Sequence, residues 1–250
     1  MALNIIAMSS LDSPPTALQF SQHPSSNAIG ADHAAALAWL ETAISTLYPA
    51  ARTPPTQDKP PVLARSAYLD LYSTVHEYFE ATNTARESPN SDDLYYFLRN
   101  QIKAYCLDIR TLLDTPDDVA EVDGARHTIE MYLAQYHKLT LLAGLVSNIL
   151  RSLERTHIQR VFEGSVRIGI KDLHNVVWKD EIPQLDSESA EAGVGSKVAK
   201  ALVTLQTSAG GETGSDKELA DRFLEALKSS DEKRKDQGRT LKAFNSKACS

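Results

Sequence analysis

With 250 residues, the chain is long enough to bury a hydrophobic core without disulfide cross-links, and it can form one or two domains. Its formal net charge of -7 argues against non-specific binding to nucleic acid or to anionic lipid, since both need a dense basic surface. Cys106 and Cys249 lie far apart in the sequence, and we find neither a signal-peptide pattern nor a membrane-spanning apolar run. We therefore expect an intracellular protein, in the cytoplasm or the nucleus, with no nucleic-acid or membrane partner.

The chain begins with a segment, residues 1–31, that is rich in serine and proline and almost free of charge. We expect this segment to be disordered and to play no part in the core. Asp32 can then cap the N-terminus of a first helix. The apolar stripe of this helix consists of Leu37, Leu40, Ile44 and Leu47. Paired prolines at 54–55 and 60–61 predict an extended linker after it.

A second helix is predicted to start near Ser66, and a third to start at Asp92 or Asp93, either of which can cap it. Apolar residues in both segments recur at the three- to four-residue spacing of a helix, so they share one face. In the second helix they are Tyr68, Leu71, Tyr72, Val75, Tyr78 and Phe79. In the third they are Leu94, Phe97, Leu98, Ile102, Tyr105, Ile109 and Leu112, all expected to face inward.

The fourth helix is predicted to run from about Asp123 to about Arg160, which gives a length on the order of 50 Å. One apolar seam along it consists of Ile129, Tyr132, Tyr136, Leu139, Ala143, Val146, Leu150 and Leu153, and a second of Leu142, Leu145 and Ile149. A helix that is apolar on two faces needs neighbours on both. We therefore predict an all-α bundle or solenoid around this helix, in which a fifth helix ending near Trp178 completes a five-helix unit over residues 32–180.

Residues 181–250 carry weaker amphipathic helices and a tail that we expect to be flexible. The apolar positions of these helices are Val198, Leu202, Leu205, Leu219, Phe223, Leu224 and Leu227. They are too few for an independent domain, so these helices either pack on the first unit or begin an incomplete second one.

No pattern of catalytic or metal-ligating residues stands out. The glycines of segment 193–197 lack the spacing of a phosphate-binding loop, and no strand precedes them. Cys106 lies on an apolar helix face, which favours an inert, buried thiol. The histidines lack the spacing of a zinc site, and we expect each at the surface or partly buried in a helix. They are His127, His137, His157 and His174. We therefore expect no enzyme, and no metal or cofactor site.

Six short segments of the chain, taken in sequence order, carry a resemblance to a known protein family. They are Ala67-Tyr68-Leu69-Asp70-Leu71-Tyr72-Ser73-Thr74-Val75, Leu94-Tyr95-Tyr96-Phe97-Leu98-Arg99-Asn100, Tyr132-Leu133-Ala134-Gln135-Tyr136, Leu153-Glu154-Arg155, Val176-Val177-Trp178-Lys179-Asp180 and Gly211-Glu212-Thr213. In this order they resemble the N-terminal region of the cullin family, over roughly Ala36 to Leu227. The resemblance implies an elongated helical solenoid of cullin-repeat type, with a first repeat at 32–180 and the start of a second in 181–250.

Cullins are scaffolds of ubiquitin ligases, so the resemblance implies a non-catalytic module of ubiquitin-dependent protein catabolism that docks a substrate adaptor of SKP or BTB type. The residues that would face the adaptor, carried over by position, are Tyr68, Leu69, Tyr72, Leu145, Ile149 and Ser152. Tyr68 and Tyr72 could equally belong to the core, whereas Leu69 lies off the main stripe and is better placed for an exposed contact. The family has an aromatic residue at the position of Ser152. We therefore expect the adaptor-binding surface to lack an aromatic contact there.

The matched segments do not include the C-terminal domain with which cullins grip a RING subunit, and we expect no RING subunit as a partner. The alternative is a structural or tethering module built from helical repeats and unrelated to ubiquitin, since a helical fold does not by itself set a function.

Overall fold

The structure is a computed structural model, and it describes residues 18, 20, 32–51, 63–84, 90–113, 121–158, 168–182, 194–208 and 216–226. Within these residues the regular elements are helices, apart from one isolated parallel bridge between Leu18 and Leu63. The prediction of an all-α protein is therefore confirmed. In this part of the chain, no helix combines the length and the apolar character needed to cross a membrane.

Four long helices, of 19 to 28 residues, dominate the molecule. They are α2 (His33–Ala51), α3 (Arg65–Thr84), α4 (Asn90–Leu113) and α5 (Val122–Ile149). The shorter elements are α6 (Arg151–Leu153), the π-helical turn η1 (Glu154–Ile158), α7 (Ile170–Glu181) and α8 (Val194–Ser208). Residues 216–226 form a further helical segment.

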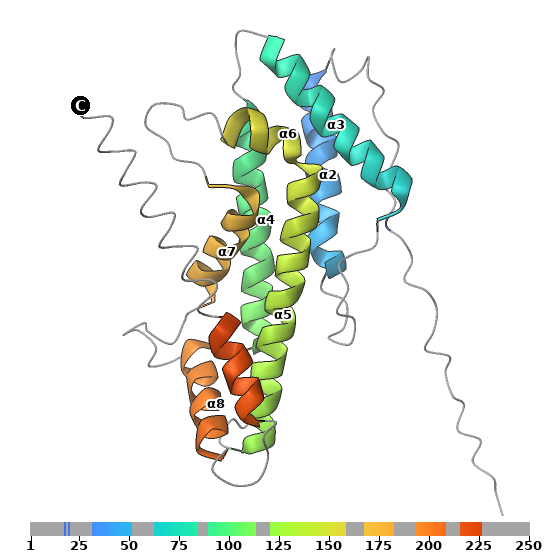
Figure 1. Cartoon of the computed structure of the whole chain (residues 1–250). Helices are drawn as coiled ribbons and strands as arrows, with labels where there is room; N and C mark the ends of the chain where they lie inside the picture. The colour runs from blue at the N-terminus through green and yellow to red at the C-terminus, as the bar shows by residue number, and fades with distance from the viewer. Residues whose placement is uncertain are drawn as a thin grey trace, which may run out of the picture.

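Helix α5 runs along the middle of the molecule (Figure 1). Helices α2 and α4 lie beside it, α3 crosses near the end that leads into α6, and α8 and residues 216–226 lie at the opposite end. Because α5 contacts α2, α3, α4, α7 and α8, it has neighbours for both of its apolar seams. Every seam residue is buried except Tyr136 and Leu145, which are partly buried against the core. The predicted central helix is confirmed.

The prediction of one unbroken helix from about Asp123 to about Arg160 is wrong. Helix α5 ends at Ile149, and the next residue, Leu150, has φ −88° and ψ 25°. The chain continues as α6 and then as η1, whose Glu154 carboxylate accepts hydrogen bonds from the Ser147 hydroxyl (3.0 Å) and the Ile170 backbone N–H (3.3 Å). The apolar seam runs through this break to the buried Leu153, so apolar spacing alone could not reveal it.

The predicted helix starts have mixed outcomes. Asp32 caps α2 as expected, because its Oδ1 accepts a hydrogen bond from the Ala35 N–H at 2.9 Å. Helix α4 begins at Asn90, so Asp92 and Asp93 lie inside the helix rather than capping it. At the other end of α4, Leu113 is buried and Leu112 is 41% exposed, so the inward position assigned to Leu112 was wrong by one residue.

Two residues of the N-terminal segment pack on the core, contrary to the expectation that residues 1–31 play no part in it. The Phe20 ring meets the Trp39 ring edge-on, with 6.1 Å between their centroids, and the Leu18 carbonyl accepts a hydrogen bond from the Ala64 N–H. The partly buried Trp39 gives this apolar pair a surface to cover. The disorder predicted for the rest of the segment falls outside the described residues.

Helix α8 and residues 216–226 pack on the first unit, which was the first of the two arrangements left open. The Phe223 ring lies 5.1 Å from the Tyr132 ring of α5, centroid to centroid. The Arg126 guanidinium of α5 donates hydrogen bonds to Asp216 at 2.6 and 3.0 Å. Apolar residues of both segments belong to the same core cluster as α5. The division of the chain into repeats of cullin type stays a prediction.

Candidate functional site

Helix α3 is buried along one face and open along the other. Its inward residues Leu71, Val75 and Tyr78 have no exposed surface, because α3 packs against α2, α5 and α6. On the outward side, Leu69 is 51% exposed and Tyr72 is 37% exposed. The sequence expectation that Leu69 is exposed is therefore confirmed.

Tyr68 and Tyr72 stack on each other one helical turn apart. Their ring centroids are 6.4 Å apart and their planes differ by 11°. Tyr68 is itself partly buried against the core, so the stack holds the more exposed Tyr72 ring in place. We refer to Tyr68, Leu69 and Tyr72 as the α3 surface. A side chain held in this way loses less conformational entropy when a partner binds.

The same side of α3 becomes polar toward its C-terminal end. His76 and Glu80 are exposed and form a contact one turn apart, with Nε2 3.3 Å from Oε1. Positions 69, 72, 76 and 80 follow one another at three- or four-residue steps, so they lie along one side of the helix. The outward side of α3 thus has an apolar half followed by a polar half.

The three predicted partner-binding residues outside α3 differ in how much surface they expose. Ile149 is 1% exposed and belongs to the core, so it has no surface for a partner, and the expectation that it contacts an adaptor is not supported. Its place in the second seam of α5 explains this burial, because that seam faces other helices. Leu145 and Ser152 are partly exposed, and they lie on α5 and α6, both of which contact α3.

One buried polar residue, His174 on α7, was missed at the sequence level, where it was expected at the surface or partly buried in a helix. It is 1% exposed. Its Nδ1 lies 2.7 Å from the Ile170 carbonyl oxygen and its Nε2 lies 3.0 Å from the Tyr48 hydroxyl. A carbonyl can only accept, so Nδ1 carries the proton and Nε2 accepts from the Tyr48 hydroxyl. Burial lowers the pKa of His174 to about 4, although the hydrogen bond to Ile170 acts in the opposite direction.

A sequence signal for the burial of His174 was present. Ile170, Leu173, Val177 and Trp178 are buried and recur at helical spacing, and position 174 falls on the face that they share. At the sequence level, this histidine was considered only as a possible metal ligand, on the basis of its spacing from other ligand residues. A histidine on an apolar stripe is better interpreted as a core residue that needs a hydrogen-bond partner.

Cys106 on α4 is fully buried, as predicted. Burial raises the pKa of its thiol to about 12, and the nearby charge of Glu181 adds to this effect. The nucleophilic form of cysteine is the thiolate, which is scarce at neutral pH when the pKa is this high. Cys106 therefore belongs to the core, and its thiol is protonated at neutral pH.

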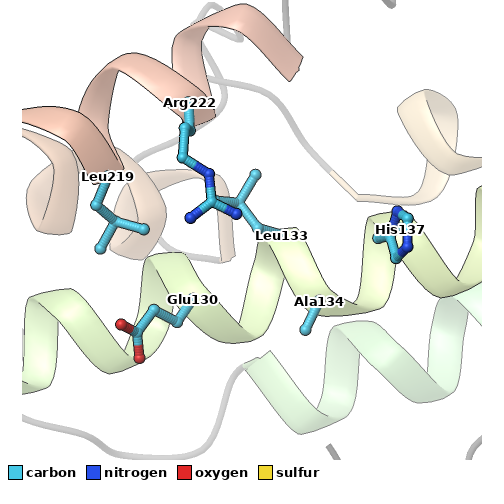
Figure 2. Close-up of a pocket in the computed structure, with 6 residues that line it drawn as sticks. All are labelled: Glu130, Leu133, Ala134, His137, Leu219 and Arg222. Carbon is cyan, nitrogen blue, oxygen red and sulfur yellow. The ribbon is translucent and has the colours of Figure 1, made fainter. Parts of the chain in front are cut away.

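A groove of about 360 Å³ lies between α5 and residues 216–226 (Figure 2). Its lining residues are Glu130, Leu133, Ala134, His137, Leu219 and Arg222. Glu130 comes from one wall and Arg222 from the other, with the side chain of Leu133 between the two helices. The lining mixes apolar and charged groups and holds no nucleophile of serine or cysteine type. Over the described ranges, no three His, Cys, Asp or Glu side chains gather in a way that could hold a metal ion.

Comparison of the chain with known proteins finds no match among protein-family models, curated proteins or solved structures.

Proposed function

We propose that this chain is a non-catalytic helical scaffold that docks a protein partner on the α3 surface, and that the partner is a substrate adaptor, of SKP or BTB type, of a cullin-RING ubiquitin ligase. The observation that carries the proposal is an exposed Leu69 beside an exposed Tyr72 whose ring is stacked on Tyr68. Aromatic anchors with polar surroundings are typical of the few residues that dominate a binding interface. The class of the partner comes from the cullin resemblance alone.

The way in which α3 is held supports a docking role. Its inward face is anchored by fully buried residues, including Leu71 and Val75. A partner therefore meets a helix that is already ordered, and less of the binding free energy is spent on ordering the surface.

The placement of the reactive side chains supports the non-catalytic part of the proposal. The Cys106 thiol and the His174 imidazole are both buried, with Cys106 0% exposed and His174 1% exposed. Burial holds each in its uncharged form at neutral pH, with the pKa of Cys106 at about 12 and that of His174 at about 4. Both groups serve the packing of helices.

The test is calorimetric titration of the purified chain with an adaptor of each type. Binding is expected in the micromolar range or tighter, about -8 kcal/mol or better, for one of the two types. Leu69→Glu is expected to weaken it by at least ~10-fold, because a carboxylate in an apolar contact stays unpaired. Leu107→Glu is the matched control. Leu107 is a 40% exposed leucine on α4, and the same change there should leave the affinity unchanged.

Three results would count against parts of this proposal. If neither adaptor type binds, the adaptor is excluded and the structural or tethering module becomes the better hypothesis. Equal binding by wild type and Leu69→Glu would leave the adaptor as the partner but would show that it does not bind at the α3 surface. Equal weakening by Leu69→Glu and Leu107→Glu would indicate a general loss of stability instead of a local contact.

A further inference from the structure

Specific polar contacts from three directions hold α7 in place. At its first turn, the Glu154 carboxylate of η1 accepts a hydrogen bond from the Ile170 N–H at 3.3 Å. One turn later, the His174 ring stacks on the Tyr48 ring of α2, with centroids 6.0 Å apart and planes at 14°. One further turn along, Trp178 Nε1 donates to the Tyr132 hydroxyl of α5 at 3.1 Å. The middle contact is the polar link between α7 and α2.

In the hydrogen-bond pattern around His174 the imidazole is uncharged. In that form Nδ1 donates to the Ile170 carbonyl and Nε2 accepts from the Tyr48 hydroxyl. Protonation would place a charge on a ring that is 1% exposed. It would also turn Nε2 into a donor, so the Tyr48 oxygen would have to accept and the Tyr48 hydroxyl proton would lose Nε2 as its acceptor. A buried charge without a counter-charge is costly, so the ring takes up a proton far more readily once it reaches water.

The groups that face His174 from α2 and α4 supply no counter-charge. Tyr48 presents a phenol, and the ring of Tyr105 meets the Tyr48 ring at 6.1 Å. Burial raises the pKa of Tyr48 well above its usual value and that of the neighbouring Cys106 to about 12. These groups therefore stay neutral over the whole acidic range.

Two tyrosines of α5 and the carboxylates at the two ends of α7 make contacts away from the His174 ring. From α5, Tyr132 and Tyr136 contact the Trp178 ring. At the two ends of α7, Glu154 accepts from the Ile170 N–H and Glu181 pairs with Lys103 at 2.9 Å. Within the described part of the chain, no carboxylate forms an ion pair with the His174 ring.

We propose that α7 is an acid-sensitive latch, in which protonation of His174 separates it from Tyr48 and releases α7 from α2, α4 and α5, while α8 stays packed on α5. Helix α8 packs on α5 through the buried apolar residues Val198, Leu202 and Leu205, which do not titrate. The latch therefore acts on one helix of the bundle.

The direction of the effect follows from the two environments of the ring. The pKa of His174 is about 4 when the helix is in place, against 6.5 for an exposed histidine. The released form binds the proton more tightly, so the latch is at full strength above pH 6.5 and weakens as the pH falls from about 6.5 to about 4. At about pH 5 these two values raise the equilibrium constant for release ~30-fold above its value at about pH 8.

Trp178 provides the readout. The chain has two tryptophans, so Trp178 is the only fluorescent indole in a Trp39→Phe background. Between about pH 8 and about pH 4.5 we expect its emission to shift to longer wavelength in proportion to the fraction of molecules in which α7 is released, while far-UV circular dichroism keeps its helical signal. Hydrogen exchange in residues 170–181, corrected for the intrinsic rate, should rise ~30-fold between about pH 8 and about pH 5, with α8 unchanged.

Two variants separate the latch from a general effect of acid. His174→Gln keeps a hydrogen-bonding side chain that cannot be protonated in this range, and its emission should stay constant. His137→Gln removes an exposed histidine of α5 and should behave like the wild type. A shift in His174→Gln that equals the wild-type shift overturns the proposal, as does a wild type whose α7 stays protected down to about pH 4.5.

The wild type decides the question if His174→Gln does not fold. An NMR titration of the histidine side chains gives the pKa of His174 directly. Proton uptake that coincides with loss of protection in residues 170–181 supports the latch. A value near 6.5 for a ring in an α7 that keeps its protection overturns it.

Discussion

Two regions of the molecule join their helices with different chemistry. Between α2 and α7, the polar link is the neutral hydrogen bond between Tyr48 and His174, which lies wholly in the core. Where α5 meets residues 216–226, the link is the charged pair of Arg126 and Asp216, whose side chains are 37% and 4% exposed. The Tyr48–His174 hydrogen bond joins two uncharged side chains, whereas the Arg126–Asp216 pair joins two charged ones.

This difference predicts which solution condition each region responds to. The neutral link is sensitive to pH, because burial moves the pKa of His174 into the acidic range. In the charged link, the hydrogen bond and the charge of Asp216 raise the pKa of Arg126, so the guanidinium stays charged. A partly exposed ion pair is screened by salt. Acid should therefore loosen the first region, and salt the second.

The largest effect is expected from Trp178, where the two regions meet. It is 1% exposed and contacts Tyr132, which in turn contacts Phe223. Trp178→Ala leaves a large cavity and should lower the free energy of unfolding by ~3–5 kcal/mol, measured by urea denaturation. The partly buried Trp39 serves as the control, since Trp39→Ala removes a side chain that is less buried and should cost less than Trp178→Ala. A loss below about 1 kcal/mol for Trp178→Ala would show that the two regions do not share a core.

A smaller effect is expected from Arg126→Gln. The change leaves the Asp216 carboxylate buried without its cation, so the protein should unfold at lower urea concentration. The difference from wild type should shrink between about 0.05 M and about 1 M NaCl, because salt already weakens the pair. Lys103→Gln removes the cation of the Lys103–Glu181 pair, in which Glu181 is 17% exposed, and should matter less. A salt-independent effect of Arg126→Gln would mean that its role is packing.

The smallest effect is expected from Gly144 in α5, and it is stabilising. A Cβ added there meets no atom within 4 Å. Gly144→Ala should raise the free energy of unfolding by ~0.5–1 kcal/mol, seen as a higher melting temperature, because alanine restricts the unfolded chain. At Gly169 an added Cβ would lie 3.1 Å from Glu154 Oε1, so Gly169→Ala should give no such gain. An equal gain at both positions would show that the Glu154 contact does not constrain α7.

Much of the fold could be predicted from the spacing of apolar residues. That spacing located the helices to within a few residues and identified α5 as the central one. It also placed Leu69 off the buried stripe of α3, where the structure has it 51% exposed. Each of these properties depends on residues within one or two turns of a single helix.

The errors came from contacts between residues that are far apart in the sequence. The break after Ile149 is accompanied by hydrogen bonds from Glu154 to Ser147 and to Ile170, the latter 16 positions away. Ile149 itself had two possible assignments, core seam or partner contact, and the neighbouring helices put it in the core. Phe20 was assigned to a disordered arm because nothing local shows that it meets Trp39.

The sequence by itself determined that this protein is helical and which face of each helix is apolar, since helical periodicity is a local property of the chain. Only the tertiary structure decided which polar groups are buried and what they contact. His174 is buried because Tyr48, 126 positions earlier, lies opposite it and satisfies its ring. Whether a polar side chain is buried depends on the partner across the interface, and the packing of the helices supplies that partner.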